Sequence, residues 1–119
     1  MPAAATVPSS TESVNDVRLV GRLSGDPAER TLPSGDVLVS FRVVVDRPRA
    51  ARRDGAPTID TVDCVAWRAD ARRTVGGCAS GDVLEVSGAL RRRFWRTGAG
   101  AASRTEVEVL RVRRRRRPG

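Results

Sequence analysis

Apolar and polar residues alternate along most of the chain from Val14 onward, and the clearest run is Val37–Val45. Every second residue of that run is Val or Phe, and Ser40 and Arg42 lie between them. Successive side chains of a β-strand point to opposite faces, so a period of two over nine residues predicts a strand and fits no helix. Branched Val side chains also favour strands.

The same alternation predicts four further strands, and one segment predicts a short helix. The additional strands are expected at Val14–Leu23, Asp60–Trp67, Val83–Trp95 and Glu106–Val112. Arg68–Gly77 places Ala71 and Val75 on one side of a helix that would end at its two glycines.

The segments between these elements are rich in turn-forming residues. Ser24–Pro27 and Pro33–Asp36 predict turns, because Gly, Pro, Asp and Ser favour turn conformations. Asp46–Ile59 predicts a long loop at the tip of a β-hairpin, and a functional loop and a solvated linker fit it equally well. Arg96–Ser103 predicts a flexible hairpin loop.

These elements imply an all-β fold with one short helix. Several strands joined by turns predict a sheet that is closed on itself or stacked, and closure removes exposed strand edges. Five strands with a helix between the third and the fourth follow the order of a five-stranded OB-fold β-barrel. We therefore predict this barrel over residues 14–112, a flexible leader over 1–13 and a polybasic tail over 113–119.

The charge of the chain favours a polyanionic partner. All 22 basic residues are Arg, and 14 acidic residues leave a net charge of +8. The run Arg113–Arg117 holds five of these arginines, so the rest of the chain has a net charge of only +3. A basic protein attracts nucleic acid or anionic membrane. From charge alone, nucleic-acid binding and a merely soluble surface are about equally supported.

The absence of His and Lys excludes several kinds of catalytic site. Without His or Lys the chain has no Ser-His-Asp or Cys-His arrangement and no Schiff-base lysine. Cys64 and Cys78 alone are too few for a zinc site and read as reduced residues of a cytoplasmic protein. No signal peptide or membrane-spanning stretch is expected. We predict no metal and no cofactor; hydrolysis by paired carboxylates stays open, but nothing points to it, and an enzyme is disfavoured.

One stretch combines aromatic rings with cations, which is what binding of unpaired nucleic acid requires. If Leu90 and Phe94 face the core, then Arg91, Arg93 and Trp95 share the outer face. An exposed ring flanked by arginines is unfavourable surface unless something covers it, and a nucleobase is a suitable cover.

Trp67 is the second candidate ring. With Cys64 and Ala66 in the core, Trp67 is expected on the outer face. That face also carries Asp63, which repels phosphate, so a subunit interface competes as an explanation for this ring. The predicted nucleic-acid-binding residues are Trp95, Trp67, Arg91, Arg93, Arg49, Arg47, Arg52, Arg53 and Arg96.

Several segments, taken in order along the chain, resemble one known protein family. They are Val14–Leu23, Gly25-Asp26-Pro27, Pro33-Ser34-Gly35, Val39–Val43, Gly81–Trp95 and Arg104–Val109. Each is weak alone, but together they resemble the bacterial single-stranded DNA-binding protein family over residues 14–112. The chain looks like a short, accessory-type member.

The resemblance implies an OB-fold, a homotetramer, and coating of single-stranded DNA during replication, recombination and repair by a cytoplasmic, nucleoid-associated protein. Trp95 and Trp67 fall on aromatic positions of the family. Thr61 and Arg49 fall where members often hold Trp, so we expect weaker binding than in a typical member. Arg49 compensates in part, because a guanidinium both stacks and attracts phosphate.

The family likeness also implies a difference at the C-terminus. The main members carry an acidic tip that recruits partner enzymes, whereas this chain ends in Arg113–Arg117, Pro118 and Gly119. Recruitment through such a tip is therefore not expected, and the arginines would add phosphate contacts instead.

Two alternatives to single-stranded DNA binding stay open. An RNA-binding or RNA-chaperone OB protein fits the same charges and rings, because sequence does not reveal recognition of the 2′-hydroxyl. An OB-fold assembly module that binds protein is the other, because this fold hosts many functions.

Overall fold

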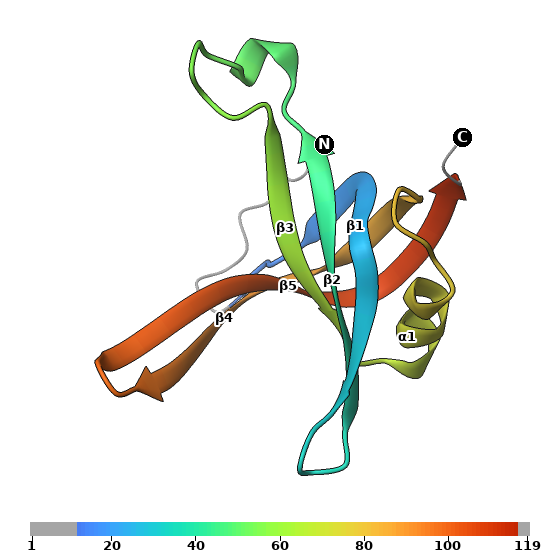
Figure 1. The fold of residues 1–119 in the computed structure, drawn as a ribbon, viewed down its shortest axis with the longest axis vertical. Coiled ribbons are helices and arrows are strands. Elements are labelled where there is room, and N and C mark those ends of the chain that lie inside the picture. The colour runs from blue at the N-terminus through green and yellow to red at the C-terminus, as the bar shows by residue number, and fades with distance from the viewer. Residues whose placement is uncertain (1–11, 117–119) are drawn as a thin grey trace.

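The computed structural model of the chain describes residues 12–116. Five strands form one closed barrel in the order β1-β2-β3-β5-β4 (Figure 1). They are β1 (Val17–Thr31), β2 (Val37–Asp46), β3 (Ile59–Ala66), β4 (Val83–Thr97) and β5 (Gly100–Arg116). The β3–β5 pairing is parallel and the other four are antiparallel. The predicted OB-fold β-barrel with one short helix is confirmed.

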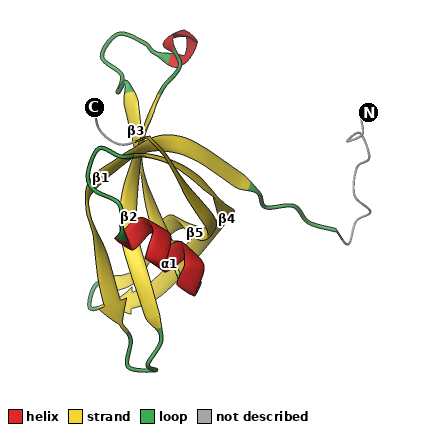
Figure 2. Cartoon of the chain, turned by 90° about the vertical axis from the view of Figure 1, so that its right-hand side faces the viewer, coloured by secondary structure: helices red, strands yellow, loops and turns green. Residues whose placement is uncertain are grey.

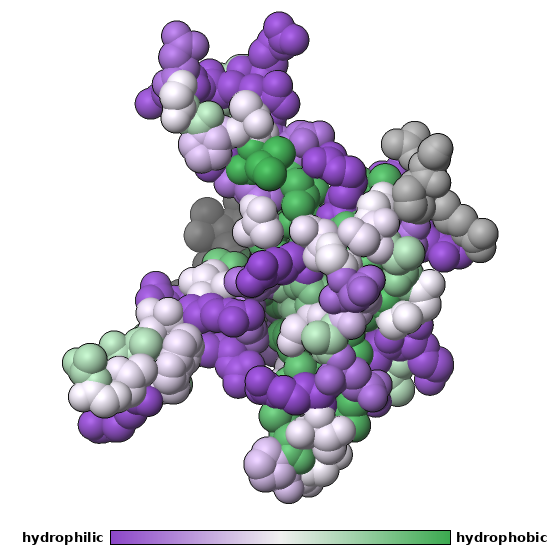
Figure 3. Space-filling model, viewed as in Figure 1, coloured by the Kyte–Doolittle hydropathy of each residue, from purple (hydrophilic) through white to green (hydrophobic). Residues whose placement is uncertain are grey.

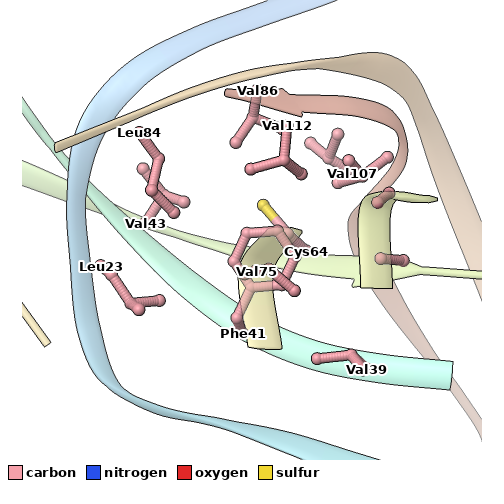
Figure 4. Close-up of a cluster of buried hydrophobic side chains, with 13 residues drawn as sticks. Leu23, Val39, Phe41, Val43, Cys64, Val75, Leu84, Val86, Val107 and Val112 are labelled. Atoms are coloured by element: carbon pink, nitrogen blue, oxygen red, sulfur yellow. The ribbon is translucent and has the colours of Figure 1, made fainter. Parts of the chain in front are cut away.

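The core lies inside the barrel and follows from the alternation of the strands. Val39, Phe41 and Val43 of β2 are at most 4% exposed and meet residues of every other strand. Figure 4 shows these side chains converging around Cys64 and Val75. The strand predicted at Val37–Val45 is therefore confirmed, and the face that Val39, Phe41 and Val43 share points into the barrel.

Helix α1 (Ala69–Gly76) follows β3 and packs against the barrel (Figure 2). It places Ala71 and Val75 in the core, as the spacing of these two residues predicts. Among residues 12–116, no helix is long and apolar enough to cross a membrane.

The turn expected at Ser24–Pro27 is instead a bulge within β1. The pairing of β1 with β2 shifts register between Ser24 and Ala28, and the strand then continues to Thr31. Gly25 has a φ of +76°, a conformation that glycine adopts without steric penalty. Its N–H donates to the Ser80 hydroxyl at 3.1 Å. The turn-forming residues therefore bend a strand here rather than end it.

The prediction of a flexible loop at Arg96–Ser103 is also wrong. From the Gly88–Val109 pair onward, β4 and β5 pair without interruption to Thr97 and Gly100, so only Gly98 and Ala99 form the turn. The Thr97 hydroxyl donates to the Gly100 carbonyl at 2.9 Å and accepts the Ala99 N–H at 3.2 Å. This hairpin projects beyond the barrel (Figure 1). Its strands are held by backbone pairing and carry no buried apolar face, which concealed them in the sequence.

The predicted leader and the predicted tail both extend beyond the described residues. β5 runs to Arg116 and pairs with the start of β4, so Arg113–Arg116 belong to a strand rather than to a tail. The remainder of the predicted tail, residues 117–119, lies outside the described residues. The same is true of residues 1–11 of the predicted leader.

The loop expected at Asp46–Ile59 is observed between β2 and β3. It contains a single 3₁₀ turn, η1 (Arg49–Ala51). In Figure 1 this loop stands at one end of the β2–β3 pair, and the β1–β2 turn stands at the other end.

Candidate nucleic-acid interface

An open groove of about 450 Å³ runs between the outer wall of the barrel and the projecting β4–β5 hairpin. We call it the hairpin groove. The residues that line it are Arg30, Leu38, Ser40, Val65, Arg93, Phe94, Trp95, Arg104 and Glu106. They come from all five strands, so only the closed barrel brings them together.

Leu38, Ser40 and Val65 form the floor of the groove. Leu38 and Val65 are 2% and 3% exposed, although neither belongs to the core cluster inside the barrel. Ser40 pairs with Val65 across β2 and β3, and Leu38 has the same parity as Ser40. These side chains therefore lie together on the outer side of the barrel wall.

The hairpin contributes two aromatic rings. Trp95 is 47% exposed and Phe94 is 71% exposed. The predicted outward position of Trp95 agrees with this exposure. The assignment of Phe94 and Leu90 to the core is wrong, because Leu90 is also 46% exposed. Beyond the barrel the hairpin has no core to cover either of its faces.

Phe94 is the functional candidate that sequence reasoning missed. Its partner across the ladder is Ser103, and Ala102 faces Trp95. The guanidinium carbon of Arg92 lies 5.5 Å from the centre of the Phe94 ring, within the range of a cation–π contact. The signal in the sequence was the pair of adjacent rings opposite a segment of small residues.

Carboxylates hold the arginines of the groove in place. Glu106 is 6% exposed, and its oxygens lie 3.4 Å from Arg93 Nη1 and 3.8 Å from Arg104 Nε. Arg104 also lies 3.7 Å from Asp63. Arg30 has no carboxylate partner among the described residues. The lining carries three guanidinium groups against one carboxylate, so the groove is positive.

The other predicted hairpin arginines lie beside the groove. Arg91 pairs with Glu108 at 3.0 Å, and Arg96 is exposed near the hairpin turn. Neither lines the groove. Figure 3 shows hydrophilic residues gathered along the base of the hairpin and over the β2–β3 loop.

Trp67 occupies a different environment from Trp95. It follows the last residue of β3, is partly buried, and belongs neither to the core nor to the groove lining. Its carbonyl accepts a hydrogen bond from Arg72 Nε at 3.0 Å. The structure therefore does not bring the two predicted rings into one site.

The arginines of the β2–β3 loop divide into two groups. Arg47 donates to the Asp60 carboxylate at 2.8 Å, and this hydrogen bond lowers the pKa of Asp60. Arg52 donates to the Arg47 carbonyl at 2.9 Å. Arg49 and Arg53 are exposed and form no ion pair within the described part of the chain. The loop stands at the far end of β2–β3 from the groove floor.

The chain matches one protein family over most of its length. A profile of the single-strand binding protein family matches residues 14–114. A single-stranded DNA-binding protein of Halalkalibacterium halodurans is 32% identical over 87 residues, 73% of this chain and 51% of the relative. Single-stranded DNA-binding protein A of Bacillus subtilis is 32% identical over 87 residues, 73% of this chain and 50% of the relative. The chain thus spans about half the length of these curated relatives.

A solved structure shares the fold. The chain of a Plasmodium falciparum SSB complex with ssDNA superimposes with a TM-score of 0.72 at 20% sequence identity. The match covers 87% of this chain and 95% of the other. At this identity the likeness establishes the common barrel architecture.

Proposed function

The chain belongs to the single-strand binding protein family, and we propose that it binds single-stranded DNA without sequence preference through the hairpin groove. The observation that carries the proposal is the half-exposed Trp95 ring, which lines one groove together with Arg93 and Arg104. The protein acts as a binding module rather than as an enzyme.

The groove supplies both interactions that an unpaired strand needs. A base stacks on Trp95, and each stacked base is worth about 1–3 kcal/mol. Arg30, Arg93 and Arg104 contact the phosphates beside it. Every base has a flat face and every nucleotide a phosphate, so this recognition does not depend on sequence.

Further contacts extend the path of the strand. Phe94 offers a second ring on the opposite face of the same hairpin, within reach of a strand that passes over its edge. Arg91 and Arg96 flank the groove, while Arg49 and Arg53 meet phosphates at the β2–β3 loop. Arg47 and Arg52 act mainly by holding that loop, and Trp67 forms an outlying contact.

The proposal includes the assembly and the setting of the protein. The chain forms a homo-oligomer, a tetramer in the form typical of the family, and coats single strands in replication, recombination or repair at the nucleoid. Its relatives in Halalkalibacterium halodurans and Bacillus subtilis are single-stranded DNA-binding proteins, which supports the ligand class.

Fluorescence titration with oligo-dT tests the groove directly, because the chain has two Trp residues. Trp67→Phe leaves Trp95 as the only indole, and oligo-dT should quench it. Trp95→Phe leaves Trp67, and quenching should be much weaker. Trp95→Ala should weaken binding by about 1–3 kcal/mol. Unchanged Trp95 emission at saturating oligo-dT would refute the groove as the binding site.

A matched oligo-rU strand separates the DNA proposal from the RNA alternative. The expected result is tighter binding of oligo-dT at equal length and salt. A clear preference for oligo-rU would reverse the assignment. Complexes that resist salt and contain a partner protein would favour an assembly module instead.

A further inference from the structure

The projecting β4–β5 hairpin has a second face, opposite the one that carries Trp95. Residues that pair directly across two strands share a face, and the next residue along a strand lies on the other face. Trp95 and its partner Ala102 therefore lie on one face, and their neighbours lie on the other. We call this other face the back face. Its members are Arg92, Phe94 and Arg96 of β4 and their direct partners Thr105, Ser103 and Ala101 of β5.

The back face prolongs the inner face of the barrel beyond the point where the barrel ends. Val107 has the same parity as Thr105 in β5 and is 1% exposed in the core. Farther along the hairpin, which stands clear of the barrel in Figure 1, Phe94 is 71% exposed. Arg92 and Arg96 are exposed as well. A side-chain pattern that fills the core inside the barrel therefore presents an uncovered ring to solvent outside it.

The back face is positive and carries no carboxylate. The chain has no Asp or Glu from residue 90 to residue 105. Arg92 and Arg96 form no ion pair with any residue in the range 12–116. Arg92 instead donates to the Ser103 hydroxyl at 2.9 Å, which holds its guanidinium beside the Phe94 ring. The groove, in contrast, contains the carboxylate of Glu106.

We propose that the back face binds a second segment of single-stranded DNA while the groove binds the first. Phe94 offers a ring on which a base stacks. Arg92 and Arg96 lie two residues to either side of it, about 7 Å along the strand, where they meet the neighbouring phosphates. Of the back-face residues only Phe94 also lines the groove. The ligand class rests on the proposed function, whereas the two arginines belong to a surface of their own.

The hairpin keeps the two segments far enough apart to be held together. Layers packed on a sheet lie about 10 Å from it, so segments on the two faces are about 20 Å apart. Salt screens charges over about 8 Å at physiological ionic strength, so the two sets of phosphates repel each other little. A second copy of this chain is a poor occupant, because two positive back faces repel and each offers one ring. Two segments held on one hairpin fold a long strand back on itself.

The number of short strands bound per chain tests the back face. The probe is a dT strand of about five nucleotides, near the lower limit of the site size of an OB-fold, and calorimetry at low salt counts the strands. The Trp67→Phe protein, in which Trp95 reports on the groove, should bind two strands per chain. Arg92→Glu in that background places a carboxylate on the back face. It should bind one strand, and should keep the affinity measured by Trp95 quenching within about twofold, because salt screens the opposite face. Phe94→Ala should also bind one strand.

The control variant Arg73→Glu makes the same charge reversal on α1 and should keep both strands. One strand per chain before any back-face substitution, or an equal loss in Arg92→Glu and Arg73→Glu, would overturn the back face as a site. So would a changed subunit number of Arg92→Glu in light scattering, because the back face would then be an interface between copies. Binding that leaves Trp95 emission unchanged and is lost in Arg92→Glu would refute the groove and leave the back face standing.

Discussion

Glu106 is a carboxylate placed where phosphates are expected to bind. It is nearly buried, and its partners Arg93 and Arg104 line the same groove. A carboxylate there orients the two guanidinium groups at the cost of opposing the ligand. Its contribution to stability and its effect on binding therefore have opposite signs.

Glu106→Gln separates these two effects. We expect oligo-dT to bind more tightly at low salt, because one negative charge leaves the groove and two arginines are released. The fold should lose about 1.5–3 kcal/mol, the range for a hydrogen bond to a charged group. Anisotropy and urea unfolding measure the two quantities. Weaker binding by a folded variant would show that ordering the arginines matters more than the charge.

The two cysteines differ in reactivity because of their burial. Burial raises the pKa of the Cys64 thiol to about 12, and the thiolate is the reactive form. At pH 8 we expect iodoacetamide to modify the less buried Cys78 first and to leave Cys64 protected. In denaturant both should react at similar rates. Mass spectrometry of timed samples measures this, and rapid native labelling of Cys64 would contradict its place in the core.

Residue parity predicted part of the site and failed where its premise failed. Trp95 was predicted outward, and it is half-exposed in the groove. Phe94 was predicted inward, but parity separates core from solvent only while the strand lines a barrel. Arg30 and Arg104 reach the groove through the pairing of distant strands, and no pattern within one segment reveals that pairing.

At the scale of elements, the run of arginines in β5 shows that a strand gives neighbouring identical residues different surroundings. Arg113 and Arg115 are exposed, whereas Arg114 Nη1 lies 3.9 Å from the carboxylate of Asp82. Asp82 is 2% exposed and also accepts the N–H of Ala79 at 2.8 Å. A sequence of five identical residues gave no sign of these different roles.

Single substitutions of Arg114 and Arg113 should reveal their different contributions to stability. Arg114→Gln leaves a buried carboxylate without its cation, so we expect it to cost about 1 kcal/mol or more of the free energy of unfolding. Arg113→Gln should change that free energy by less than about 0.5 kcal/mol, because the side chain is exposed. Urea denaturation of both variants makes the comparison. Equal stability would mean that the contact between Arg114 and Asp82 does not support β5.

Elements with a buried face were predictable, and those without one were not. β2, β3 and α1 each place an apolar face against the core, so their periodicity marks them. The far half of the β4–β5 hairpin lacks such a face, and β1 continues through a bulge at Gly25. Backbone pairing and scattered polar contacts, such as the hydrogen bond from Arg92 to Ser103 at 2.9 Å, hold these segments, and neither leaves a periodic trace in the side-chain pattern.

At the scale of the whole molecule, net charge alone does not identify the arginines that bind DNA. Seven of the ten ion pairs within residues 12–116 join a basic side chain to a carboxylate that is at least one-fifth exposed. Such pairs contribute little to stability, but they neutralise the cation that a phosphate would otherwise meet. An arginine such as Arg30, which has no carboxylate partner among the described residues, is therefore more available to a phosphate than the ion-paired Arg93 and Arg104.

Salt dependence of oligo-dT binding tests this distinction. Each phosphate neutralised on a single strand contributes about −0.7 to the slope of log K against log salt concentration. Arg30 is in the groove and has no carboxylate partner among the described residues, so Arg30→Gln should shallow the slope by about 0.7. Arg73→Gln removes an exposed charge from α1 and should leave the slope unchanged. Equal slopes for the two variants would mean that binding senses the total charge of the protein rather than the charges of the groove.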